Sequence, residues 1–116
     1  MLISGDLQAF RAYTTMYIPK IKNGKLELYN ERGIYQRTIQ SSGVVYADIN
    51  MTQTLIVITD TKGCVKLYSE RGIYQRTIVS SDAASARWAG SDLAVTDTKG
   101  RIKLYNERGI FQRTIS

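Results

Sequence analysis

Short runs in which apolar and polar residues alternate recur along this chain. In the run 100–105, a charged residue separates Ile102 from Leu104, so both apolar side chains fall on one face of an extended strand. The same spacing recurs in the pairs Val65–Leu67 and Leu26–Leu28. Alternation with a period of two is typical of a β-strand with one buried face. The pattern therefore predicts an all-β protein built of short strands.

A twelve-residue segment occurs three times with few changes. It spans Leu28–Ile39, Leu67–Ile78 and Leu104–Ile115, which begin 39 and 37 residues apart. Repetition at such a period indicates a repeat architecture in which each copy is one structural unit. We divide the chain into the copies 1–40, 41–79 and 80–116. The two additional residues of the second copy are assigned to a loop near Asn50–Thr54, because surface loops tolerate insertions.

Each copy has room for four short antiparallel strands. In the third copy the expected strands are Ala83–Trp88, Asp92–Asp97, Gly100–Tyr105 and Ile110–Ile115. Four antiparallel strands in a repeat of this length match the size and order of one β-propeller blade. The small residues of the first strand fit a place beside the central axis, where strands converge. The predicted fold is three four-stranded antiparallel propeller blades, of which the first is diverged.

Several turn residues have a structural explanation. Gly33, Gly72 and Gly109 each end a four-residue turn between the third and fourth strands, where a bulged hairpin needs a positive φ. Asp60 and Asp97 end the second strand of their copies, and we expect each carboxylate to accept backbone N–H groups of the Asp-Thr-Lys-Gly turn. Two carboxylates held one blade apart are also badly placed for paired acid and base chemistry.

The segment 93–115 resembles the NHL repeat. That pattern places an aspartate at the end of the second strand, matched by Asp60 and Asp97, and a glycine in the later turn, matched by Gly33, Gly72 and Gly109. The resemblance covers the second and third copies and the latter half of the first. It implies a propeller fold, but members range from RNA-binding and protein-binding modules to lyases and lactonases, so it implies no single activity.

The first copy departs from this pattern in its second strand. Ile21 stands at the aspartate position, and Pro19 lies in the middle of the strand, where the sheet needs a backbone N–H. We therefore expect a bulge or another irregularity in the second strand of the first blade.

Three blades are too few to close a propeller, because such rings have about four to eight blades. Open blade faces would expose apolar surface to water. Two chains together supply six blades, with blade 3 of one chain packing on blade 1 of the other and the contact formed twice about a two-fold axis. The sequence therefore predicts a homodimer in which each chain is half of a six-bladed propeller.

The composition argues against catalysis. The chain has 116 residues, no histidine and one cysteine, Cys64. Histidine is the commonest general base and metal ligand, and without it no residue is placed to activate the Cys64 thiol. The enzymes of the NHL-like group are described as using metal sites that include histidine, so that activity does not carry over. We expect a binding or scaffold module with no catalytic residue, metal site or cofactor.

One candidate ligand site lies on the innermost strands. Arg11, Asp48 and Arg87 take equivalent positions in the three copies. If these side chains point into the channel, the dimer carries a ring of arginines and aspartates that suits an anion. The alternative is that the charges pair with one another and with water.

A second candidate is a basic face formed by Lys22, Lys62 and Lys99 in the turn after the second strand. The net charge of +6 allows an acidic partner, and propellers that bind single-stranded RNA use a positive face with aromatic platforms. The charge is spread, however, by arginines at the opposite face and by the exposed rim residues Arg37, Arg76 and Arg113, as in a surface selected for solubility. A multivalent carbohydrate-binding lectin, with tyrosines for stacking, is a further alternative.

The N-terminal residues show no basic and apolar segments of a secretory signal, and the longest apolar run, around 55–58, is far too short to span a membrane. We therefore expect a cytoplasmic protein without membrane association.

Overall fold

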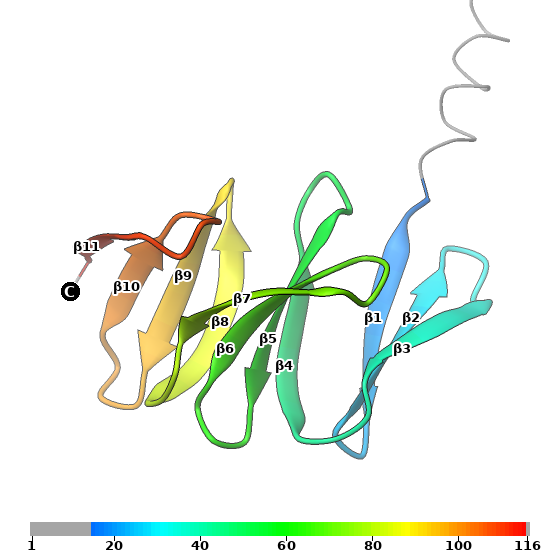
Figure 1. The fold of residues 1–116 in the computed structure, drawn as a ribbon, viewed down its shortest axis with the longest axis horizontal. Helices are drawn as coiled ribbons and strands as arrows, with labels where there is room; N and C mark the ends of the chain where they lie inside the picture. The colour runs from blue at the N-terminus through cyan, green and yellow to red at the C-terminus, as the bar shows by residue number, and fades with distance from the viewer. Residues whose placement is uncertain (1–14, 116) are drawn as a thin grey trace, which may run out of the picture.

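The computed structural model describes residues 15–115, which form three antiparallel sheets standing side by side (Figure 1). Blade 1 contains β1 (Tyr17–Lys22), β2 (Lys25–Asn30) and β3 (Tyr35–Gln40). Blade 2 contains β4 (Val44–Ile49), β5 (Leu55–Asp60), β6 (Val65–Ser69) and β7 (Tyr74–Val79). Blade 3 contains β8 (Ala83–Ala89), β9 (Asp92–Asp97), β10 (Ile102–Tyr105) and β11 (Phe111–Thr114).

In each blade, neighbouring strands follow one another in the chain, so every sheet is an antiparallel meander. The fold prediction is confirmed to that extent: the protein is all-β, and its second and third sheets have four strands. The first strand expected for blade 1 falls outside the described residues. Within the described range, no helix is long and apolar enough to cross a membrane.

The apolar core lies between the blades. Blades 1 and 2 bury a cluster made of Leu26, Leu28, Ile39, Val44, Ile56 and Ile58. Blades 2 and 3 bury a second cluster made of Val57, Val65, Leu67, Ile78, Ala83, Ala86, Leu93 and Val95. Because side chains alternate along a strand, β5 serves both seams, with Ile56 and Ile58 toward blade 1 and Val57 toward blade 3. This explains why β5 begins with four consecutive apolar residues, 55–58.

The turn before the last strand of each blade is a bulged hairpin, as the sequence predicts. Each of the three hairpins has a register shift beside the turn and a glycine at φ between 79° and 84°. A side-chain oxygen closes each turn by accepting two backbone N–H groups, and these oxygens belong to Asn30, Ser69 and Asn106. Side chains that accept from nearby backbone are the reason that Asn and Ser favour turns.

The prediction of a bulge or another irregularity in the strand that contains Pro19 is wrong, because β1 pairs regularly with β2. From Tyr17 opposite Asn30 to Lys22 opposite Lys25, the register is unbroken, and Pro19 sits within it. The strands are joined by a two-residue turn, Asn23–Gly24, in which both residues have positive φ. Such a turn matches the twist of a hairpin.

This short turn also corrects the alignment of the first copy. In blade 2, the backbone N–H of Asp60 donates to the carbonyl of Cys64, with three residues between them. Lys22 and Lys25 are the equivalent pair in blade 1, with two residues between them. The turn has lost one residue, so Lys22 and not Ile21 occupies the aspartate position.

Two glycines at equivalent positions test how closely the blades pack. Gly63 and Gly100 both have positive φ, but a Cβ at Gly63 would lie 2.8 Å from the backbone nitrogen of Asp82, whereas at Gly100 nothing lies within 4 Å. Both alanine substitutions incur the left-handed penalty of about 1–2 kcal/mol. We expect Gly63→Ala to cost about 1–3 kcal/mol more, because the strand of blade 3 must move. Urea unfolding measures the difference, and equal costs would contradict this tight contact.

Candidate functional site: the seams between the blades

The outer strand of each blade is fastened to the following blade by an arginine. Arg37 Nη1 donates to the carbonyl oxygen of Glu70, and Arg76 Nη1 donates to the carbonyl oxygen of Glu107 at 2.9 Å. Both carbonyls lie in the turn before the last strand of the next blade. A hydrogen bond from a charged donor is stronger than one between neutral groups.

An isoleucine two residues after each arginine completes the contact. Its δ-methyl group packs on the glycine of the same turn: Ile39 Cδ1 lies 3.6 Å from where a Cβ of Gly72 would stand, and Ile78 Cδ1 lies 3.4 Å from that point at Gly109. We call the arginine–carbonyl bond with this isoleucine–glycine contact the outer lock. It occurs once at the seam of blades 1 and 2 and once at the seam of blades 2 and 3.

A second fastening joins the blades nearer the central axis. The carbonyl of Gly24 accepts from the backbone N–H of Val44 at 2.9 Å, and the carbonyl of Gly63 accepts from Ala83 at 3.0 Å. The two bonds run from the β1–β2 turn to β4 and from the β5–β6 turn to β8, the first strand of the next blade in each case. Together with the outer lock, it holds each seam at two places across the sheet.

Blade 3 presents one half of the outer lock, and no described residue completes it. Ile115 is 57% exposed, whereas the equivalent Ile39 and Ile78 are 9% and 8% exposed. Arg113, the third arginine of the series, is exposed. On the same face, Ile102 and Leu104 are half-buried, although their equivalents in blades 1 and 2 are fully buried.

Blade 1 presents the complementary half of the lock. Gly33 stands where Gly72 and Gly109 receive an isoleucine, but no atom of residues 15–115 lies within 4 Å of the point where its Cβ would be. The adjoining sheet surface is more polar than in the other blades. In the pairing with β2, Lys20 takes the place of the buried Ile58 and Val95. Its ammonium lies 5.5 Å from the centre of the Tyr29 ring.

The residues proposed to line the channel are only partly brought together. Asp48 and Arg87 lie on the neighbouring inner strands β4 and β8, at the wall of a shared hollow. Asp48 Oδ2 accepts the backbone N–H of Trp88 at 2.9 Å, which ties β4 to β8. No ion pair joins Asp48 to Arg87 in the portion of the chain the structure describes. Arg11 lies outside the described residues.

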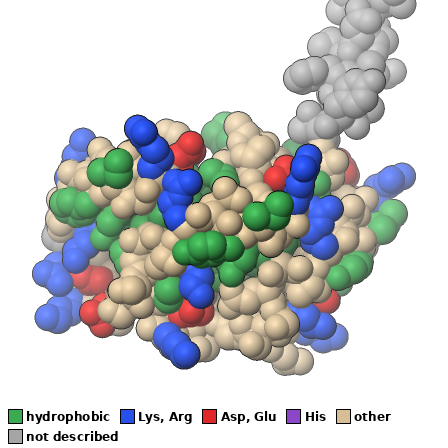
Figure 2. All heavy atoms as spheres, in the orientation of Figure 1, with side chains coloured by type: hydrophobic (Ala, Val, Ile, Leu, Met, Phe, Trp, Pro, Cys, Tyr) green, Lys and Arg blue, Asp and Glu red, His purple; other side chains and the backbone are tan. Residues whose placement is uncertain are grey.

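The three lysines of the proposed basic face are not equivalent. Lys62 and Lys99 lie in matching turns, whereas Lys22 is the last residue of β1 and pairs with Lys25. In the two matching turns, Asp60 Oδ1 accepts the backbone N–H groups of Lys62 and Cys64, and Asp97 Oδ1 accepts those of Lys99 and Arg101. Cations are scattered over the face drawn in Figure 2 and do not gather there.

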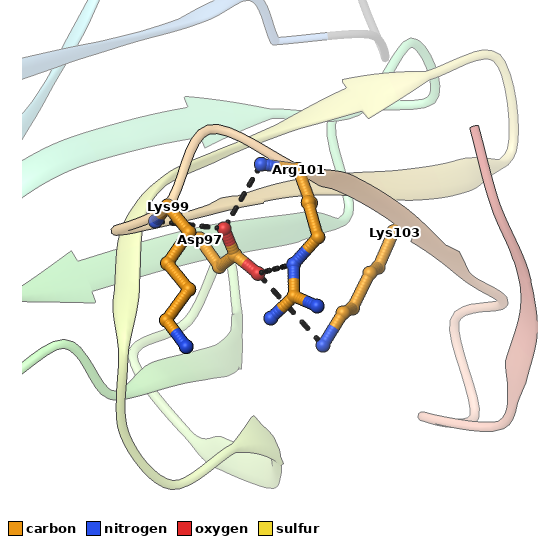
Figure 3. Close-up of polar contacts among 4 residues, drawn as sticks. All are labelled: Asp97, Lys99, Arg101 and Lys103. Atoms are coloured by element: carbon orange, nitrogen blue, oxygen red, sulfur yellow. Dashed lines mark hydrogen bonds and ion pairs between the residues drawn. The ribbon is translucent and has the colours of Figure 1, made fainter. Parts of the chain in front are cut away.

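Asp97 lies at the centre of a group of polar contacts with Lys99, Arg101 and Lys103 (Figure 3). In addition to its two backbone donors, its Oδ2 lies 3.0 Å from Arg101 Nε and 3.9 Å from Lys103 Nζ. The backbone hydrogen bond from Arg101 is the chief reason that the pKa of Asp97 lies below its ordinary value, and burial opposes this shift. Asp97 therefore stays ionised and orients both cationic side chains.

Cys64 is not activated as a nucleophile. Burial raises the pKa of the Cys64 thiol, with a further contribution from Asp60, so the protonated and unreactive form is favoured. Between residues 15 and 115, no cluster of three or more acidic, cysteine or histidine side chains is placed to hold a metal ion.

The outer lock is the feature that the sequence pattern did not reveal. Arg37, Arg76 and Arg113 were expected as exposed rim residues, but Arg37 and Arg76 are half-buried between blades. Their threefold repetition was the available signal, because a residue with no structural task has no reason to recur at every repeat.

The lowered pKa of Asp97 predicts how its contribution to stability depends on pH. A carboxylate whose pKa is lower in the folded state stabilises that state above the ordinary aspartate pKa of about 3.9, and loses this effect as the pH falls through the lowered value. We expect Asp97→Asn to be less stable than the native protein at pH 7 and the difference to shrink below about pH 4. Thermal unfolding between pH 7 and 2 measures it, with Glu107→Gln as the charge control. A difference independent of pH would contradict this account.

Comparison with known proteins supports the fold. No protein-family model matches the chain, and no curated protein matches it. A chain in the crystal structure of the mitotic checkpoint complex matches over 87% of this chain, with a TM-score of 0.66 and 18% identity. A chain of the HIRA(644-1017) crystal structure matches over 84%, with a TM-score of 0.55 and 14% identity.

Both solved structures are β-propeller proteins, and this chain spans about a third of their length, 33% and 35% respectively. At these identities the likeness concerns the fold alone. The blades of this chain are therefore β-propeller blades, while the finer resemblance to the NHL repeat is not shown by these matches.

Proposed function

We propose that this protein is a non-catalytic β-propeller module that binds other proteins, and that its ring is closed by a second copy of the chain. The observation that carries the proposal is the outer lock, which is complete at two seams and open in complementary halves on blades 3 and 1. The exposed half offers Arg113 and Ile115, and the vacant half offers the carbonyl of Glu31 beside Gly33.

The geometry of the closing seam follows from the repeat. Arg113 of one copy would donate to the Glu31 carbonyl of the other, and Ile115 would pack on Gly33, as in the two seams within the chain. Two copies of three blades give a six-bladed ring, within the range of known propellers. The same contact then forms twice about a two-fold axis, which uses every open half.

Burial of apolar surface would drive this association. Ile102, Leu104 and Ile115 would pass from partial exposure to the buried state of their equivalents. Full burial of a side chain of this size contributes about 1.5–3 kcal/mol. On the blade 3 side, the closing seam would thus bury the same apolar positions that the internal seams bury.

On the blade 1 side, Lys20 distinguishes the closing seam from the internal ones. Its aliphatic stem can cover apolar side chains, while its ammonium remains beside the Tyr29 ring at the edge. The closing seam is consequently less apolar than the two internal seams, where Ile58 and Val95 pack against the preceding blade. We therefore expect the closing seam to be weaker than the seams within each chain, so that the dimer dissociates on dilution while the blades of each chain stay together.

Binding of proteins is favoured over catalysis or binding of nucleic acids. The outer rim repeats an exposed pair of apolar residues in every blade: Ile34 and Tyr35, Ile73 and Tyr74, Ile110 and Phe111. Each pair is about half exposed, and each aromatic ring stacks edge-on against a tyrosine of the neighbouring strand, 5.7–5.9 Å away. Rigid aromatic residues of this kind are enriched at protein interfaces. One structural neighbour is itself part of a protein assembly, the mitotic checkpoint complex.

Removing the exposed half of the lock tests the ring. In Ile115→Asp combined with Arg113→Ala, both changed residues are exposed, so the single chain should fold as before. We expect sedimentation equilibrium to give about 26 kDa for the native protein, twice the chain mass of 13.1 kDa, and 13.1 kDa for the variant.

Arg108→Ala, which removes one charge from an exposed turn, is the matched control and should stay dimeric. A native protein that sediments as one chain at all concentrations would refute the closure. A variant that remains dimeric would refute the role of the lock and leave another seam as the contact.

A further inference from the structure

A groove runs between blades 2 and 3 on the side of the molecule where the chain passes from one blade to the next. One wall is the link Ser80–Asp82 with the end of β7, and the other is the β9–β10 turn with β10. Its volume of about 680 Å³ lies in the range of pockets that hold small ligands.

One wall of this groove carries a row of hydrogen-bond donors. Lys103 and Tyr105 alternate along β10, and Arg101 directly precedes the strand at the same spacing, so all three side chains share one face, and all three line the groove. Alternate residues on a strand lie about 6.6 Å apart, so the row extends over about 13 Å.

In the equivalent rows of the other blades, the tyrosine hydroxyl has a hydrogen-bond acceptor. On β2, Lys25 Nζ lies 3.6 Å from Glu27 Oε2, and the Tyr29 hydroxyl donates to Glu27 Oε1 at 3.1 Å. On β6, the hydroxyl of Tyr68 donates to Gln40 Oε1 at 3.4 Å. The strands have the same backbone arrangement in the two blades, and a side-chain oxygen accepts the tyrosine hydroxyl in each.

The row on β10 lacks these acceptors. Val79 stands where blade 1 has Gln40, and Lys103 stands where β2 has Glu27. No hydrogen bond of the Tyr105 hydroxyl is present among residues 15–115. Arg101 likewise replaces the uncharged Cys64. The β10 row thus directs two cations and a phenol toward the groove.

Asp97 holds the cations in place without using all their donors. Arg101 engages Oδ2 through Nε alone, which leaves both terminal Nη groups for another acceptor (Figure 3). The side chain of Arg101 is half exposed, and Lys103 is one-third exposed. Lys99, Arg101 and Lys103 outnumber the two carboxylates of the groove, Asp82 and Asp97, so one positive charge remains.

We propose that this groove binds an oxyanion, a phosphate or carboxylate group, through the Nη groups of Arg101 and the ammonium of Lys103. A guanidinium fork binds both groups with paired hydrogen bonds. The hydroxyl of Tyr105 and the side chain of Val79 contact the remainder of the ligand. Asp97 is a positioning residue that acts through Arg101. The site lies within one chain and does not depend on closure of the ring.

The anion can be free or carried by a peptide, and titrations with four probes distinguish these sources. NMR titrations at low salt use inorganic phosphate, acetate, a phosphoserine peptide and the same peptide without phosphate. We expect saturable shifts at Arg101, Lys103 and Ser80 with one site per chain. Tenfold tighter binding of the phosphopeptide than of phosphate, with no binding of the bare peptide, identifies an anion carried by a peptide. Equal affinity identifies a free anion.

Three variants test the residues. Arg101→Cys gives blade 3 the residue that blade 2 has at this position, Cys64. The substitution should weaken binding about tenfold or more, because a charged donor is lost. Arg108→Ala removes the same charge from an exposed turn and should leave affinity unchanged. Cys64→Arg places the guanidinium at the equivalent point of blade 2 and should add a second site. Amide spectra confirm that each variant is folded.

The proposal is overturned if no probe gives saturable shifts. It is also overturned if Arg101→Cys and Arg108→Ala weaken binding equally, because the attraction then comes from net charge and not from the groove.

Discussion

The contact between the outer strand of one blade and the glycine turn of the next is the interaction on which the rest of this structure depends. A single blade is a small sheet with apolar side chains on both faces, and β5 shows this directly with Ile56 and Ile58 on one face and Val57 on the other. Such a sheet gains stability from each neighbour that covers one of its faces. Stability in a repeat protein is then a sum over blades and seams, and each seam needs a device that sets the spacing.

The outer lock explains why the twelve-residue segment is so nearly invariant among the copies. Both halves of the lock lie inside it: the Glu-Arg-Gly turn receives a neighbour, and the Arg-Thr-Ile strand reaches the next one. Loss of the turn glycine, of the arginine or of the isoleucine would damage a seam on one side of the blade. The first strands β4 and β8 lie side by side, and there the copies differ freely, as Asp48 and Arg87 illustrate.

The sequence was sufficient for the blades and insufficient for the seams. Alternation and the repeat period predicted the strands and the bulged hairpins, because both depend on local residue order. The register of β1 was mispredicted because one residue is missing from the turn before Lys25, and an alignment on Gly24 and Gly63 conceals it. The partner of Arg37 could not be predicted either, since its acceptor is a backbone carbonyl 33 residues away. For the same reason, a tie such as that of Asp48 to Trp88 needs the three-dimensional structure.

The seams also determine where the repeats are free to diverge. One backbone geometry carries three different sets of side chains at the alternate positions 25, 27 and 29 of β2, 64, 66 and 68 at β6, and 101, 103 and 105 at β10. Residues 64 and 101 directly precede their strands. These side chains lie on the opposite face of the strand from Leu28 and Leu67, which pack on the following blade, and they belong to neither fastening. Substitution there leaves the outer lock intact, so a carboxylate, a thiol or a guanidinium is tolerated at little cost to the ring. A propeller assembled from near-identical blades can therefore acquire a distinct ligand site in one groove while its rim and seams continue to repeat.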